Sequence, residues 1–114
     1  MNIIDNNITI DELKIIAENT FGDLVKAVVD IKQRILVIDA EMHADMEAFL
    51  LENGSQQEDI WGINLRPFED IDNFVEFDSM INIRPRQGNR SIGVGNEEIQ
   101  LQIKELINNK VVKQ

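Results

Sequence analysis

The chain has 114 residues, 43% of them hydrophobic and 28% charged, which suits one folded domain and excludes wholesale disorder. The formal net charge of −10 at pH 7 disfavours nucleic acid as a partner. No cysteine is present, which excludes a disulfide framework, a thiolate zinc site and a cysteine nucleophile.

The first predicted elements are a short strand and a helix. Residues 3–4 are both isoleucine and favour the strand. Thr9 and Glu12 form a T-x-x-E capping box, which predicts that a helix begins here. Gly22 stands where the residue after a helix end belongs, so we expect the helix to end near Phe21.

The middle of the chain alternates between strands and a helix. Runs of β-branched residues at 25–31 and 35–38 predict an antiparallel hairpin. Residues 39–53 return to helical spacing of apolar side chains, and Gly54 is expected to end that helix.

Two further strands and a helix are predicted in the last half of the chain. Residues 60–65 and 75–83 have strand character and form a second hairpin through the acidic loop 68–73. Residues 86–95 are polar and contain three glycines, which predicts a loop. Asn96 is a typical N-cap, and an apolar stripe at helical spacing follows it.

The resulting order, β-α-β-β-α-β-β-α, predicts one α+β domain over residues 1–114. Two hairpins most simply form a single, mostly antiparallel sheet with helices packed on a face. The chain shows no signal-peptide pattern and no apolar stretch of about 18 residues, so we expect a cytoplasmic protein with no membrane partner.

Four strings in the chain resemble a known family. They are GDLVKAVVD at 22–30, EMHADME at 41–47, WGINL at 61–65 and FDSMINIRPRQGNRS at 77–91. In these strings the chain is similar to a small family of uncharacterised bacterial and archaeal proteins, a domain of unknown function. The resemblance implies a single-domain prokaryotic protein, and it assigns no activity, cofactor or catalytic residue.

Charge is segregated along the chain. Residues 39–78 hold twelve acidic side chains and one basic one, whereas residues 79–96 hold three arginines and no acid. Guanidinium and amide groups supply directional donors that suit a carboxylate or a phosphate. The candidate ligand-binding residues for a small anion or acidic group are therefore Asn82, Arg84, Arg86, Gln87, Asn89 and Arg90, with Trp61 and Asn64 from the preceding strand.

An alternative role for the three arginines is internal. They could neutralise the acidic segments of their own chain, as exposed ion pairs commonly do. Asn64 and Asn82 leave two possibilities open as well, because an amide within an apolar strand needs partners. The two side chains pair across the hairpin, or they face a polar pocket with Arg84.

His43 is the only histidine and the only candidate for acid–base chemistry. Asp45 and Glu47 are close in sequence, and Glu47 lies one helical turn away, where a carboxylate could orient the imidazole as a general base. These three residues are the candidate catalytic set. No H-E-x-x-H string is present, so no metal site is assigned, although carboxylate binding of a hard cation such as magnesium stays open.

Three functional hypotheses follow from these patterns. The first is a binding module with an Arg/Asn-rich site for a small anion or acidic group. The second is a structural protein or a homodimer that pairs through a sheet edge or the hairpin at 28–38. The third is an enzyme that depends on His43. No cofactor-binding motif is present, and we expect no cofactor.

Overall fold

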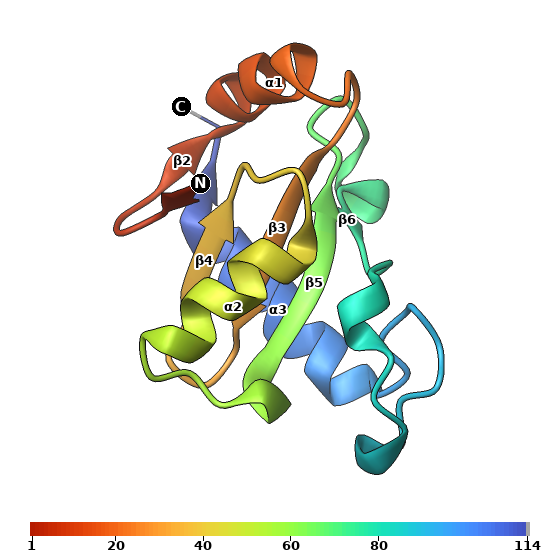
Figure 1. Ribbon diagram of the computed structural model, residues 1–114. Coiled ribbons are helices and arrows are strands. Elements are labelled where there is room, and N and C mark those ends of the chain that lie inside the picture. Colours follow the sequence, from red (N-terminus) through yellow and green to blue (C-terminus); the bar gives the residue numbers. More distant parts are fainter. Residues whose placement is uncertain (114) are drawn as a thin grey trace.

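The computed structural model describes residues 1–113 and contains a five-stranded antiparallel sheet. The strands lie side by side in the order β1 (Asn2–Ile3), β4 (Ile35–Ile38), β3 (Val25–Asp30), β5 (Ile60–Leu65) and β6 (Val75–Glu76) (Figure 1). Both predicted hairpins are confirmed, since β3 pairs with β4 and β5 pairs with β6. A separate parallel pair joins β2 (Ile8–Thr9) to β7 (Val111–Val112).

The first and last helices begin where the sequence predicts, whereas the middle helix begins four residues later than the predicted range. Helix α1 (Ile10–Asn19) starts at the predicted capping box, in which the Thr9 hydroxyl oxygen accepts a hydrogen bond from the Glu12 amide at 3.0 Å. Helix α2 spans His43–Glu52, within the predicted range. Helix α3 (Glu97–Lys110) is capped by the Asn96 side chain. No helix in residues 1–113 combines the length and apolar character that a membrane crossing requires.

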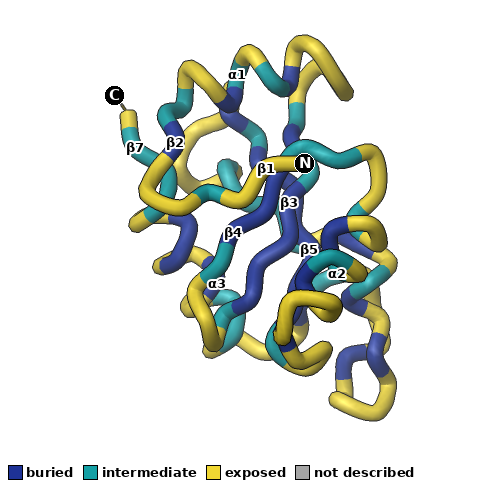
Figure 2. Tube along the Cα trace, turned by 60° about the vertical axis from the view of Figure 1, so that its left-hand side comes forward, coloured by how far each residue is buried: buried dark blue, intermediate teal, exposed yellow. Residues whose placement is uncertain are grey.

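Helices cover both faces of the sheet, whereas the sequence predicted cover on one face. Helices α1 and α3 pack on one face and α2 on the other (Figures 1 and 2). The reason lies in the side-chain alternation of the strands. Alternate residues of β5 such as Trp61 and Ile63 lie in the α1–α3 core, and Ile60 lies in the core beneath α2. Figure 2 shows the resulting burial of the central strands.

The predicted strand at 75–83 is wrong beyond Glu76. The chain leaves the sheet there and forms a 3-10 turn at Met80–Asn82. It passes so close to β5 that a Cβ atom added to Gly62 would lie 2.5 Å from Ser79 Oγ. Gly62 therefore permits a backbone approach that no other residue type would allow.

Candidate functional site

Asn82 continues the hydrogen-bond ladder of β5 after β6 has ended. Its side-chain oxygen accepts from the Gly62 amide at 2.8 Å, and its side-chain nitrogen donates to the Gly62 carbonyl at 2.9 Å. The same nitrogen also donates to the carbonyl of Ile92 at 2.9 Å. Asn82 is fully buried, and it does not bond to Asn64.

Arg84 is also directed into the protein. It is only 8% exposed, and its guanidinium carbon lies 4.3 Å from the centre of the Trp61 ring. The guanidinium donates to the carbonyl oxygens of Gln57 and Ile60 and to Gln87 Oε1. Burial lowers the pKa of Arg84, and within residues 1–113 no carboxylate forms an ion pair with it. Through these carbonyl contacts Arg84 ties its own segment of the chain to the start of β5.

Asn89 organises the segment that follows Arg84. Its side-chain nitrogen donates to the carbonyl of Asn82 at 2.7 Å and to that of Gly93 at 2.8 Å. Its side-chain oxygen accepts from the Gly95 amide at 2.9 Å. We call residues 79–95 the basic loop. Buried amide and guanidinium groups close it on itself, so its shape is fixed by internal hydrogen bonds.

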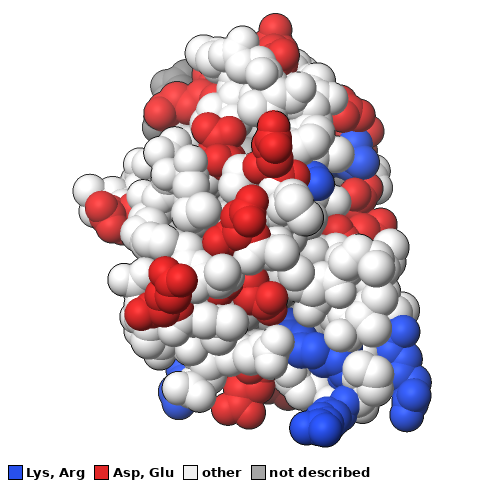
Figure 3. Space-filling view, in the orientation of Figure 1, with Lys and Arg blue, Asp and Glu red and all other residues white. Residues whose placement is uncertain are grey.

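Arg86 and Arg90 differ from Arg84, because both are exposed. Neither forms an ion pair within the part of the chain that the structure describes, even though the chain has 21 acidic residues. Figure 3 shows most of the visible basic side chains toward the lower end of the molecule and a few at the upper right, with acidic side chains spread over the rest of that face. The sequence-based alternative, in which the arginines neutralise acids of their own chain, finds no support at these two positions.

A cavity of about 290 Å³ lies beside the basic loop. Trp61 lines it and is 2% exposed, and the indole nitrogen of Trp61 is buried without a hydrogen-bond acceptor. We call this space the Trp61 cavity. Its lining combines part of the basic loop with the start of α3: Trp61, Gln87, Gly88, Asn89, Gly95, Asn96 and Ile99. Sequence analysis missed Asn96 and Ile99, because their proximity to Trp61 arises only from the packing of α3.

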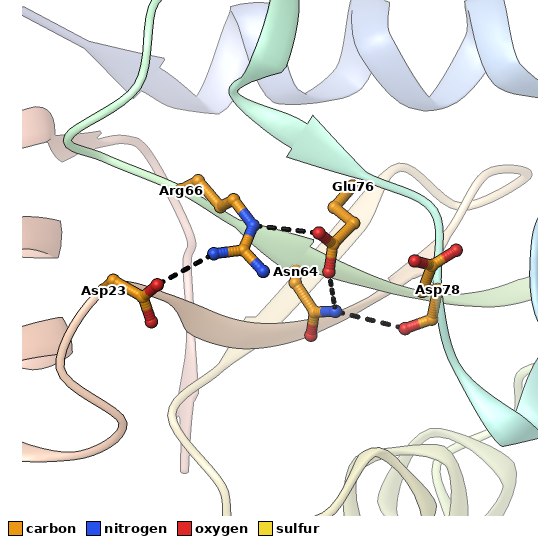
Figure 4. Close-up of polar contacts among 5 residues, drawn as sticks. All are labelled: Asp23, Asn64, Arg66, Glu76 and Asp78. Atoms are coloured by element: carbon orange, nitrogen blue, oxygen red, sulfur yellow. Dashed lines mark hydrogen bonds and ion pairs between the residues drawn. The ribbon is translucent and has the colours of Figure 1, made fainter.

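Asn64 lies elsewhere, in a polar row on the α2 face of the sheet (Figure 4). Its side-chain nitrogen donates to Glu76 Oε1 at 2.8 Å and to the carbonyl of Asp78 at 3.1 Å. Arg66 binds the second oxygen of Glu76 at 2.9 Å and Asp23 at 3.0 Å. The hydrogen bond from Arg66 is the main reason that the pKa of Glu76 is lowered. The period of two in β5 could have indicated this row, since it places Asn64 and Arg66 on one face.

His43 lies at the start of α2, with its Nε2 atom 2.8 Å from the carbonyl oxygen of Ile63. Because a carbonyl oxygen only accepts, Nε2 carries the hydrogen and donates. Burial lowers the pKa of His43, against the opposing effect of this hydrogen bond. Within residues 1–113, neither Asp45 nor Glu47 bonds to the imidazole, so the structure does not assemble the three candidate catalytic residues.

No group of three or more metal-ligating side chains that could hold a metal ion occurs in residues 1–113. The structure brings only part of the predicted ligand-binding set to one place, since Trp61, Gln87 and Asn89 line the Trp61 cavity and the others do not. Asn82, Arg84 and Asn89 hold the basic loop from within, Arg86 and Arg90 lie on its surface, and Asn64 belongs to the separate polar row.

These observations define an α+β protein with helices on both sides of an antiparallel sheet. Side-chain hydrogen bonds fix the shape of its basic loop, which lies beside a small cavity. The family described as "Protein of unknown function (DUF5674)" matches residues 2–110, and the chain belongs to that family. The resemblance to an uncharacterised family is therefore confirmed. No curated protein and no solved structure shows a significant match to the chain.

Proposed function

We propose that this protein is a binding module that holds a small anion, such as phosphate or a carboxylate group, in the Trp61 cavity. Arg86 and Arg90 are exposed, and in the chain they directly precede and follow the lining residues Gln87–Asn89. The observation that carries the proposal is the buried indole N–H of Trp61, which has no acceptor.

An indole nitrogen can only donate, and a buried donor without an acceptor costs free energy of about 1–3 kcal/mol. Such a group in a native protein calls for an explanation, and an unseen acceptor is one of the few available. Trp61 is a lining residue of the cavity, and a small shift of its ring or of its neighbours would let a bound oxygen atom reach the buried indole nitrogen and supply that acceptor. Gln87 and Asn96 add amide groups to the same lining.

The two exposed arginines supply charge for the ligand. In a chain with a net charge of −10, Arg86 and Arg90 have many carboxylates to pair with and pair with none of those in residues 1–113. An anion between them would gain charge-assisted hydrogen bonds of the kind that guanidinium forms with carboxylate and phosphate. The start of α3 contributes little, because exposed Glu97 and Glu98 already occupy its first turn.

The remaining predicted ligand-binding residues have a different part in this proposal. The guanidinium group of Arg84 lies over the face of the Trp61 ring. Asn82 and Asn89 fix the course of the basic loop through their hydrogen bonds. These three residues preorganise the site, and contact with the anion falls to the other lining residues of the cavity and to the two exposed arginines.

The test uses Trp61 fluorescence, which reports on this site alone because the chain has one tryptophan and no tyrosine. Dilute protein is titrated with sodium phosphate and, separately, with a small dicarboxylate, at constant ionic strength. We expect a saturable change in Trp61 emission. The double substitution Arg86→Ala and Arg90→Ala should raise the dissociation constant by about tenfold or more, because two charge-assisted contacts are lost.

The control is Lys32→Ala with Arg34→Ala, which removes the same charge from the turn between β3 and β4. This control should bind as tightly as the unmodified chain. Emission that responds equally to sodium chloride, or that is unchanged by the loss of Arg86 and Arg90, would show that the cavity does not select an anion.

A further inference from the structure

We propose that two copies of this chain pair through two complementary patches on the β6 side of the sheet. One patch is the segment 68–72, which we call the acidic tip. The other is the exposed surface of the basic loop. This inference goes beyond the proposed function, because it requires a second copy of the chain and no small ligand.

The acidic tip joins negative charge to exposed apolar side chains. Ile71 is 83% exposed and Phe68 is 51% exposed, and they alternate with Glu69, Asp70 and Asp72. Isolated exposed apolar residues are normal, but these two belong to one short segment without a basic residue.

The acidic tip also borders a second cavity, larger than the Trp61 cavity. This cavity measures about 640 Å³ and lies between the segment 69–75 and the end of α3. Its apolar wall includes Phe74, Val75 and Ile107, and Ile71 lines it as well. We call it the tip cavity. It has ample room for one or two apolar side chains from outside.

Charge divides the rim of the tip cavity. Glu69 and Asp72 lie on the β6 side, whereas Lys104 and Lys113 lie on the side of α3 and β7. Lys104 also lies 5.8 Å from the Phe77 ring centre. A partner that brings positive charge is therefore expected to approach from the β6 side.

The basic loop combines exposed apolar side chains with positive charge, whereas the acidic tip combines them with negative charge. Met80 is 75% exposed, Ile92 43% and Ile83 37%, and the exposed Arg86 and Arg90 belong to the same loop. Methionine and arginine are enriched at protein interfaces. A loop that carries exposed apolar side chains and exposed arginines complements an apolar cavity with carboxylates on its rim.

The two patches cannot meet within one chain. Figure 1 shows residues 71–73 toward the upper end of the β6 side and residues 85–87 at its lower end. A two-fold rotation about an axis through that side would place each patch of one copy on the other patch of its partner. Such an interface is self-complementary and closes at two copies. Met80 is the side chain we expect to enter the partner's tip cavity.

The test is the solution mass, measured by sedimentation velocity from micromolar to millimolar protein at low and high sodium chloride. We expect a monomer–dimer equilibrium that salt weakens, because exposed charge pairs are screened. Arg86→Glu with Arg90→Glu should weaken dimerisation at least about tenfold, and so should Glu69→Arg with Asp72→Arg, since each places like charges together. An equimolar mixture of the two variants should restore the dimer, because both contacts are again complementary.

The mixture also controls for misfolding, since unfolded variants could not rescue one another. Lys32→Glu with Arg34→Glu carries the same change in charge as the first variant and should dimerise normally. A monomer at every concentration, a dimer that ignores both charge reversals, a mixture that stays monomeric, or a mass that grows beyond two copies would each overturn the proposal. The phosphate titration uses dilute protein and a different signal, so either proposal can fail without the other.

Discussion

The side chains of Asn82 and Arg84 form hydrogen bonds with the backbone of β5 beyond the end of β6. They show how far residue type alone can predict the role of a polar side chain. Amide and guanidinium groups in an apolar segment require partners, which is why the sequence singled them out. The sequence could not distinguish internal partners from a ligand, because a backbone carbonyl and an anion satisfy the same donors. In the structure, the carbonyls of Gly62 and Ile60 are among the partners.

His43 makes stability depend on pH. Burial lowers its pKa in the folded protein below the ordinary value of 6.5. Between these two values the unfolded chain binds more protons, so the stabilising contribution is complete above pH 6.5 and is lost as pH falls toward the lowered value. We expect the free energy of unfolding, measured with urea, to decrease from about pH 8 to about pH 5.

The variant His43→Gln should flatten that profile while keeping a donor near Ile63. Glu76 provides a separate pH window, because its pKa is lowered from 4.5 and its contribution is lost only in more acidic solution. Glu76→Gln should therefore leave the profile above about pH 5 unchanged. An equal slope in the chain with and without His43 would assign the pH dependence to other groups.

Elements with a local cause were predicted well, and elements that depend on distant packing were not. The capping box at Thr9 and the N-cap Asn96 set helix starts through contacts within three residues. Strand β6 ends early because the segment after Glu76 packs against Gly62, which no local pattern reveals. Likewise, the apolar run of β5 did not show that helices cover both of its faces.

The close contact at Gly62 gives a prediction for stability. In Gly62→Ala the new Cβ would lie 2.5 Å from Ser79 Oγ and 2.6 Å from Ser79 Cβ, so either β5 or the basic loop must shift. We expect a loss of about 2 kcal/mol in the free energy of unfolding. Gly93→Ala is the matched control, because its Cβ would meet nothing closer than 3.7 Å. Equal stability of both variants would mean that the loop yields without cost.

At the scale of the whole molecule, charge is the property that the sequence described best. The segregation of acids from arginines along the chain reappears as the basic end in Figure 3. The Trp61 cavity was beyond sequence analysis, because it joins Gln87–Asn89 to the start of α3 through the fold alone. Thus the arginines and the lining residues Trp61, Gln87 and Asn89 were predictable, whereas the cavity and its contact with α3 were not.

The net charge of −10 predicts that salt stabilises the folded protein. Raising sodium chloride from about 0.01 M to about 1 M shortens the screening length from about 30 Å to about 3 Å and so relieves repulsion among the acids. We expect the thermal unfolding midpoint to rise by several degrees. Glu18→Gln with Glu52→Gln should reproduce part of that gain at low salt, because both residues are exposed. A midpoint that falls with added chloride would contradict this explanation.

The parallel pairing of β2 with β7 joins residues 8–9 to residues 111–112. Lys110 strengthens the same junction by donating to the carbonyls of Ile4 and Asp5. During synthesis on the ribosome, β2 therefore emerges long before β7 has been made. The core contacts of Ile8 also require residues of α3, which are made late. The hairpin of β3 and β4 can form early, but the pairing of β2 with β7 and the contacts of Ile8 with α3 form only once residue 112 has left the ribosome.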